Sequence, residues 1–122
     1  MTNNTTSSPH LSTKKVAIVI LNWNGAKLME EFLPSVIAYS PIERTEVVVA
    51  DNGSTDNSIA LLQEKFPSVR IIRLDKNYGF AEGYNQALKQ LDNEYTVLLN
   101  SDVEVTPGWL DAPLAALEAD AT

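Results

Sequence analysis

The sequence predicts an α/β fold with a mostly parallel sheet and helices on both faces. Apolar segments of strand length alternate along the chain with segments of helical periodicity, in the order β-α-β-α-β-α-β-α. That order requires right-handed crossovers between parallel strands. The strand segments are also rich in Val, Ile and Leu without polar alternation, as expected of strands that are covered on both faces.

The first predicted strand covers residues 15–22 and runs into the polar turn Asn22-Trp23-Asn24-Gly25. A helix is predicted over 26–39, because apolar residues recur there at helical spacing. They are Leu28, Phe32, Val36 and Ile37. Pro34 lies inside this pattern, so we expect a kink or two shorter helices.

The second predicted strand covers 46–50 and ends in Asp51-Asn52-Gly53-Ser54-Thr55-Asp56. Asn-Gly favours a turn, and the Ser, Thr and Asp oxygens that follow it favour the start of a helix. The expected helix covers 56–66, and Pro67 marks its end. Its apolar face consists of Ile59, Leu62 and Phe66.

A third strand is predicted at 69–74, followed by a loop and then a helix over 84–91. The fourth strand, at 95–99, is expected to be buried and ends in Asn100-Ser101-Asp102. A last helix is expected to begin with Thr106 as its N-cap and Pro107 at its first position. Its packed face would contain Trp109, Leu110, Leu114 and Leu117.

Composition indicates one soluble globular domain that does not bind nucleic acid. The chain has 122 residues, of which 44% are hydrophobic and 20% are charged. Its net charge of -7 disfavours a protein that tracks nucleic-acid phosphates with Lys and Arg. There is no Cys, which excludes disulfides, a thiol nucleophile and Cys-based zinc sites. Residues 1–13 are polar and lack a signal-peptide core, so we expect a disordered leader before a cytoplasmic domain at 14–122.

Polar clusters follow the first, second and fourth predicted strands. They are Asn22, Trp23 and Asn24; Asp51 and Asn52; and Asn100 and Asp102. The carboxyl ends of parallel strands share one edge of a sheet, and ligands bind at that edge in such folds. Each cluster alone is compatible with an ordinary polar turn, but their convergence favours a binding site.

The residue types in these clusters suit a nucleotide. Trp23 can stack on a base, and Asp51 can accept hydrogen bonds from the edge of the base. The alternative for Trp23 is a core aromatic. Asn100 can hydrogen-bond a ribose hydroxyl, and Asp102 can hold Mg²⁺ or Mn²⁺ against ligand phosphates. In so acidic a chain, the metal ion would supply most of the positive charge at a phosphorylated ligand.

The loop before the third helix is a weaker candidate for phosphate binding. It carries Asn77, Gly79 and Gly83, and its glycines would let the backbone approach a pyrophosphate closely. Lys76 and Arg73 are possible phosphate partners, although a solvated surface role is the favoured alternative for each.

Other uses of this topology do not fit the sequence. A dinucleotide-binding fold has Gly-x-Gly-x-x-Gly after its first strand, where this chain has only Gly25. The Gly-Lys-Ser/Thr of a P-loop is absent from the sequence. A phosphoacceptor receiver domain would carry acidic residues after its first strand, where this chain has Asn22-Trp23-Asn24.

Taken together, these segments resemble the N-terminal part of a family 2 glycosyltransferase with the GT-A fold, and most of all its rhamnosyltransferase-like branch. The resemblance covers about Lys15 to Leu117. The matching segments are Val-Ala-Ile-Val-Ile-Leu-Asn-Trp-Asn-Gly, Val-Val-Val-Ala-Asp-Asn-Gly-Ser-Thr-Asp, Asn-Tyr-Gly-Phe-Ala-Glu-Gly-Tyr-Asn-Gln-Ala-Leu, Leu-Leu-Asn-Ser-Asp-Val-Glu-Val and Pro-Gly-Trp-Leu. It implies a Rossmann-like sheet in an enzyme that transfers a sugar from a nucleotide diphosphate sugar with inversion.

The resemblance also implies roles for single residues. Asp51 would contact uracil or thymine, Trp23 would occupy the base-stacking position, and Asp102 would be the metal-binding end of the family's Asp-x-Asp motif. Asn100 departs from that motif, because many members carry Asp there. The donor-side loop and helix are matched by Asn77, Gly79, Phe80, Gly83 and Asn85. The expected nucleotide-binding residues are Asn22, Trp23, Asn24, Asp51, Asn52, Asn77, Gly79, Gly83 and Asn100, with Asp102 as the ligand of Mg²⁺ or Mn²⁺.

In members of this family, the catalytic base and the acceptor half lie beyond the metal motif, so no catalytic residue is expected in this chain. We expect residues 14–122 to be the donor-binding part of a longer enzyme, truncated before the acceptor half and inactive alone. The donor would be UDP- or dTDP-linked and the acceptor a saccharide or a lipid-linked molecule, at the inner face of the membrane. Apolar surface exposed by truncation would favour a homo-oligomer. The alternative function is a non-catalytic nucleotide-sugar binding or interaction module.

Overall fold

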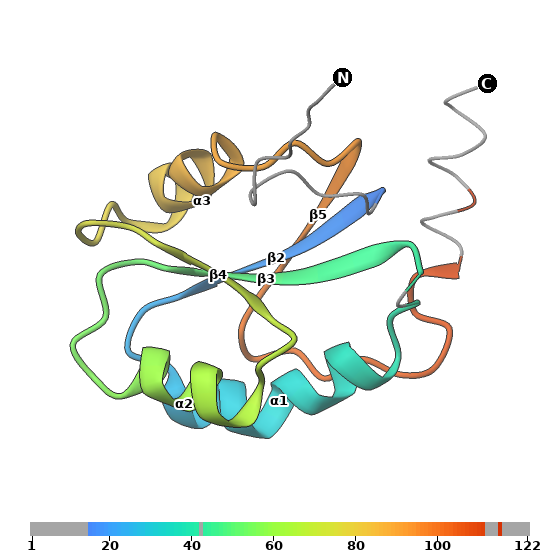
Figure 1. Ribbon diagram of the computed structural model, residues 1–122, viewed down its shortest axis with the longest axis horizontal. Coiled ribbons are helices and arrows are strands. Elements are labelled where there is room, and N and C mark those ends of the chain that lie inside the picture. Colours follow the sequence, from blue (N-terminus) through green and yellow to red (C-terminus); the bar gives the residue numbers. More distant parts are fainter. Residues whose placement is uncertain (1–14, 42, 112–114, 116–122) are drawn as a thin grey trace, which may run out of the picture.

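The computed structural model describes residues 15–41, 43–111 and 115. The predicted leader and the positions of Leu114 and Leu117 lie outside these residues. The elements are β2 (Val16–Asn22), α1 (Ala26–Ala38), β3 (Thr45–Asp51), α2 (Ser58–Lys65), β4 (Arg70–Arg73), α3 (Phe80–Leu88) and β5 (Tyr95–Leu99). The strands form a four-stranded parallel sheet in the order β4-β3-β2-β5. Helices α1 and α2 lie on one face and α3 on the other (Figure 1), which confirms the predicted fold class.

The strand register brings the predicted polar turns to one edge of the sheet. β2 pairs with β3 from Val16↔Thr45 to Asn22↔Asp51, and with β5 from Val16↔Tyr95 to Ile20↔Leu99. The residues that follow each strand therefore gather where the strands end, which we call the carboxyl edge. It lies on the left in Figure 1 for β2, β3 and β4.

The larger core lies between the sheet and α1 and α2. Even-numbered residues of β2 pack there against one stripe of α1. The buried members are Val16, Ile18, Ile20, Met29, Leu33, Val36, Val49, Leu62, Val69, Val105 and Leu110. The segment after β5 closes this core by folding back across α1: the Val105 N–H donates to Ser35 Oγ at 3.1 Å, and Trp109 Nε1 donates to Ser40 Oγ at 3.3 Å.

The second core lies under α3 and is built from smaller residues. Ala17 and Ala50 are fully buried in the sheet and Ala87 is fully buried in the helix. Small side chains on both sides let α3 approach the sheet closely. Gly83 is buried on the same helix for this reason, since a Cβ at Gly83 would lie 3.0 Å from one Leu21 methyl carbon and 3.1 Å from the other.

Helix α1 differs from its prediction in two respects. It continues through Pro34 as one helix of 13 residues instead of dividing in two. Pro34 is exposed while Leu33 and Val36 are buried, so packing against the sheet offsets the missing backbone hydrogen bond. Leu28, predicted on the packed face, is 40% exposed. The packed stripe is rotated by one residue and starts at Met29.

Three further predictions were wrong. Helix α3 begins at Phe80, so Gly83 lies inside the helix and not in the preceding loop. β5 is not buried on both faces: Leu98 is 51% exposed, because α3 packs mainly over β2 and β3. The last helix does not begin at Thr106, because the first helical residue of this segment is Asp111. Gly108 has φ 77°, a left-handed conformation that interrupts helical geometry, and 107–110 form turns.

Over the described ranges, every helix is too short or too polar to cross a lipid bilayer.

Gly83→Ala should lower the free energy of unfolding by about 1–3 kcal/mol through overpacking. This loss is expected even though Ala stabilises a helix by about 1 kcal/mol relative to Gly. The added Cβ would meet Asn52 Nδ2 at 2.9 Å, and Asn52 cannot move without losing its own hydrogen bonds. Urea unfolding measures the change. The control is Asn85→Ala on the exposed face of α3, which should be neutral or stabilising. A Gly83→Ala protein more stable than wild type would contradict the packing described.

Candidate functional site

The carboxyl edge is organised around a buried pair of side chains at the ends of β2 and β3. Asn22 Nδ2 donates to Asp51 Oδ1 at 3.0 Å, between residues that are register partners in the sheet. Asp51 is 4% exposed, and its second oxygen accepts the Ser54 N–H at 3.0 Å. Because each carboxylate oxygen has two lone pairs, Asp51 keeps acceptor capacity for a ligand at the rim.

The turn after β2 holds Trp23 in place from both sides. Asn22 Oδ1 accepts the Gly25 N–H at 3.1 Å, and the Asn24 N–H donates to Ser54 Oγ at 2.9 Å. Trp23, which lies between these anchored residues, has its side chain 55% exposed. The structure therefore excludes a core role for this ring and presents it to solvent, one residue after the register partner of Asp51.

Asn24 and Asp56 join the turns after β2 and β3 reciprocally. Asn24, with φ 52°, accepts the N–H groups of Thr55 at 2.7 Å and Asp56 at 3.1 Å on its side-chain oxygen. Asp56 in turn accepts the Ala26 N–H at 3.2 Å and the Ser58 N–H at 3.0 Å. One carboxylate thus binds the first residues of both α1 and α2.

The charge of Asp56 is stabilised by this arrangement. Partial desolvation raises the pKa of its carboxyl group, but hydrogen bonds from the Ser58 side chain and backbone and from the Ala26 backbone outweigh that effect, so the pKa lies below its ordinary value of 3.8.

Asn52 fastens the loop before α3 to the end of β3. Its Nδ2 donates to Asn77 Oδ1 at 3.1 Å and to the Gly79 carbonyl at 3.0 Å, and its Oδ1 accepts the Tyr78 N–H at 3.0 Å. Gly53 makes this approach possible: with φ 78°, its missing Cβ would lie 2.7 Å from the Lys76 carbonyl carbon. Asn52 was predicted to bind a nucleotide, but its amide is already hydrogen-bonded inside the protein.

The turn after β5 contributes the remaining predicted residues. Asn100 and Asp102 are exposed. Asn100 and Ser101 line an apolar pocket together with α1 residues that include Met29 and Leu33. Directly before this turn, the Leu99 carbonyl accepts a hydrogen bond from the buried Tyr84 hydroxyl at 3.1 Å. Burial raises the pKa of that hydroxyl above its ordinary value of 10.0, while a hydrogen bond from the Leu21 backbone partly offsets the increase.

The sheet order identifies where a ligand fits at this edge. From β2, the chain passes through α1 to β3 on one side, whereas β5, reached through α3, pairs with β2 on the other side. This reversal is a topological switch point, and ligands of open α/β sheets bind in the crevice outside the strand ends there. Asn22 and Trp23 lie at the β2 side of that crevice, and Asn100 and Asp102 lie at the β5 side.

The described residues suit a metal ion that arrives with its ligand. No group of three or more His, Cys, Asp or Glu side chains that could hold a metal occurs among them. Asp102 supplies one exposed carboxylate, with the Asn100 amide nearby in sequence. Mg²⁺ and related hard cations are often bound by one or two carboxylates plus substrate phosphates. The donor set therefore fits a cation shared with a diphosphate.

The remaining predicted residues are divided between the edge and the interior. Asn77 and Gly79 are exposed in the loop fastened by Asn52. Gly83 is buried within α3, and its role in binding a ligand stays a prediction. Sequence analysis missed Tyr84. Its spacing could have identified it, since a residue three positions before the inward-facing Ala87 lies on the same face of the helix. A tyrosine buried on that face needs a hydrogen-bond partner for its hydroxyl.

The sequence is similar to those of known glycosyltransferases. The family model described as Glycosyl transferase family 2 matches residues 17–122. The N-acetylglucosaminyl-diphospho-decaprenol L-rhamnosyltransferase of Mycobacterium tuberculosis is 27% identical over 115 residues, covering 85% of this chain and 37% of that protein. The poly-beta-1,6-N-acetyl-D-glucosamine synthase of Staphylococcus epidermidis is 26% identical over 113 residues, covering 91% of this chain and 26% of that protein. The chain thus spans only 26% to 37% of the length of these relatives.

Two solved structures are also similar to this chain, both in sequence and in fold. S. aureus TarS 1-349 in complex with UDP-GlcNAc is 26% identical, with a TM-score of 0.74 over 86% of this chain and 31% of that chain. The mannosyltransferase PcManGT from Pyrobaculum calidifontis, in complex with GDP-Man and Mn²⁺, is also 26% identical, with a TM-score of 0.67 over 78% of this chain and 29% of that chain.

The stabilising effect of Asp56 should depend on pH. Because its folded-state pKa is depressed, the contribution is complete above the ordinary value of 3.8 and is lost as pH falls through the lower folded value. Asp56→Asn should therefore be less stable than wild type at pH 7, with the difference shrinking below pH about 4. Urea unfolding across this range tests it, with the exposed Glu64→Gln on α2 as control. A difference that does not depend on pH would contradict the assigned role.

Proposed function

Because this chain belongs to glycosyl transferase family 2, we propose that it forms the nucleotide-sugar-binding part of an enzyme that transfers a sugar to an acceptor with inversion. The observation that carries the proposal is the position of three residues at neighbouring strand ends: Trp23 and Asp102 follow β2 and β5, which flank the switch point, and Asp51 ends β3 on the other side of β2. An exposed aromatic, a partly available carboxylate and a metal-binding carboxylate correspond to the base, the base edge and the diphosphate of one ligand.

The base is held by Trp23 and Asp51 in this proposal. Trp23 stacks on one face of the ring, and Asp51 accepts the N3–H of uracil or thymine through a lone pair that its contacts with Asn22 and Ser54 leave available. Both bases carry the same N3–H, so the donor is UDP- or dTDP-linked. The complexes of TarS with UDP and UDP-GlcNAc support the choice of a uracil or closely related base.

The diphosphate is held at the β5 side of the crevice. Asp102 holds Mg²⁺ or Mn²⁺, and Asn100 hydrogen-bonds the ribose. When bound, such a cation neutralises the diphosphate and stabilises it as a leaving group. The Mn²⁺ complex of PcManGT supports this assignment. A metal ion is also the expected source of positive charge in a chain whose net charge is -7.

The acceptor site and the general base are assigned to the part of the relatives' length that this chain does not cover. The lipid-linked acceptor in the name of the M. tuberculosis relative supports a saccharide or lipid-linked acceptor for the parent enzyme.

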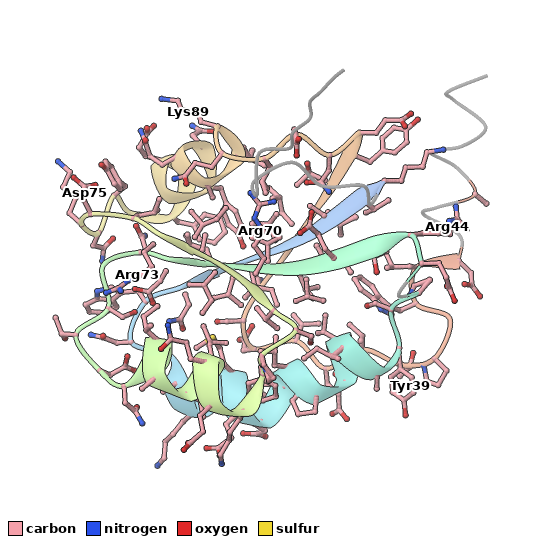
Figure 2. All side chains as sticks on the ribbon, in the orientation of Figure 1. Tyr39, Arg44, Arg70, Arg73, Asp75 and Lys89 are labelled. Atoms are coloured by element: carbon pink, nitrogen blue, oxygen red, sulfur yellow. The ribbon has the colours of Figure 1, made fainter. Side chains whose placement is uncertain are left out.

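Calorimetric titration with UDP and dTDP in Mn²⁺ tests the base site. Trp23→Ala should weaken binding by about fivefold to 150-fold, because stacking of a base on an aromatic contributes about 1–3 kcal/mol. Tyr39→Ala is the matched control: Tyr39 is also an exposed aromatic, but it lies at the opposite end of the molecule from Arg73 and the carboxyl edge (Figure 2). Equal affinities for wild type and Trp23→Ala would refute the stacking role, and a folded wild-type chain that binds neither nucleotide would refute the proposed function.

The same titration with and without Mn²⁺ tests the metal site. Asp102→Asn should abolish the gain in UDP affinity that Mn²⁺ produces, while leaving the weaker metal-free binding unchanged. Glu104→Gln, an exposed carboxylate two positions further along the same segment, is the control and should keep the gain. If Glu104→Gln loses the gain and Asp102→Asn keeps it, the metal ligand has been assigned to the wrong residue.

A further inference from the structure

Tyr84 connects α3 to the sheet at the point where β2 and β5 end. Its side chain is 5% exposed. Its hydroxyl donates a hydrogen bond to the Leu99 carbonyl at 3.1 Å. Leu99 is paired with Ile20 in the last register pair of these two strands. The hydroxyl therefore binds the last residue of β5 at the inner end of the donor crevice.

The backbone group that Tyr84 binds is adjacent to the proposed metal-binding residues. Leu99 directly precedes Asn100-Ser101-Asp102. The β2 side is fixed separately, by the hydrogen bonds of Asn22 to Asp51 and Ser54. On the β5 side, Asn100 and Asp102 are exposed. The hydrogen bond from Tyr84 is thus a contact that orients the start of the metal-binding turn.

The close packing of α3 keeps the Tyr84 ring in one position. Gly83, directly before it, allows the helix to lie against Leu21 and Asn52, and Ala87 is fully buried one turn later. The Phe80 ring meets the Tyr84 ring edge to face, with centroids 5.1 Å apart and an interplanar angle of 80°. A side chain confined in this way delivers its hydroxyl to a defined point at the end of β5.

We propose that Tyr84 is a positioning residue of the donor site, whose hydroxyl holds the carboxyl end of β5 so that Asp102 meets the metal ion and the diphosphate. This inference rests on the proposed function. It predicts that the contribution of Tyr84 appears in the metal-dependent part of nucleotide binding. Recognition of the base by Trp23 and Asp51 is anchored through Asn22 and Ser54 and depends on Tyr84 much less.

The test compares wild type, Tyr84→Phe and Ala87→Gly by calorimetric titration with UDP, in Mn²⁺ and in EDTA. Tyr84→Phe removes one oxygen and keeps the ring. It should weaken UDP binding about fivefold in Mn²⁺, the effect expected from loss of one hydrogen bond, and less than twofold in EDTA. Ala87→Gly loosens the same helix but keeps the hydroxyl, so it should change UDP affinity by the same factor in Mn²⁺ and in EDTA.

Each outcome bears on a defined claim. A wild-type chain that binds UDP, with Tyr84→Phe equal to wild type in Mn²⁺ or weakened equally in both conditions, overturns the role of Tyr84 and leaves the proposed function standing. A folded wild-type chain that binds no UDP overturns the proposed function, and the role of Tyr84 with it. If Tyr84→Phe does not fold, Phe80→Ala provides the second variant: it removes an exposed ring that confines Tyr84 and should lower UDP affinity in Mn²⁺ alone. Unchanged affinity there would also overturn the inference.

Discussion

The buried hydrogen bond between Asn22 and Asp51 is the interaction on which the rest of the carboxyl edge depends. A carboxylate that is 4% exposed needs partners, and Asn22 and the Ser54 N–H provide them. A hydrogen bond to a charged group contributes about 1.5–3 kcal/mol. It joins the last register pair of β2 and β3, so the turns after both strands start from fixed points.

From this pair, the polar side chains of the edge divide into two groups. The amides of Asn22 and Asn52 are buried and hydrogen-bonded within the protein, where they hold one loop against another. Trp23, Asn100 and Asp102 are exposed and remain available to a ligand. The division shows how a site made almost entirely of loops can be preorganised: buried amides and the Asp56 carboxylate fix the backbone, and in the proposed function the exposed groups are those that would contact the donor.

The fold class and the convergence of the polar turns could be predicted from the sequence, because both follow from apolar strands in β-α-β order. Trp23 is exposed, as the predicted stacking role requires and the core alternative does not. What could not be predicted depends on packing between distant segments. Gly83 was assigned to a loop because glycine is typical of loops, but close contact between α3 and Leu21 selects it within a helix. The exposure of Leu98 depends on where α3 lies over the sheet, and the partners of Asn52 and Tyr84 lie 25 and 15 residues away along the chain.

The central claim is that one ligand, a metal-bound nucleoside diphosphate, occupies the crevice between the ends of β2 and β5. Nuclear magnetic resonance of the labelled chain with UDP and a trace of Mn²⁺ tests it most directly, because the paramagnetic ion broadens nearby amide signals. The account predicts UDP-dependent broadening strongest at 100–102, weaker at 22–24, and absent at the amino ends of the strands around Thr45 and Tyr95. Broadening that is centred on those amino ends, or that is the same without UDP, would contradict it.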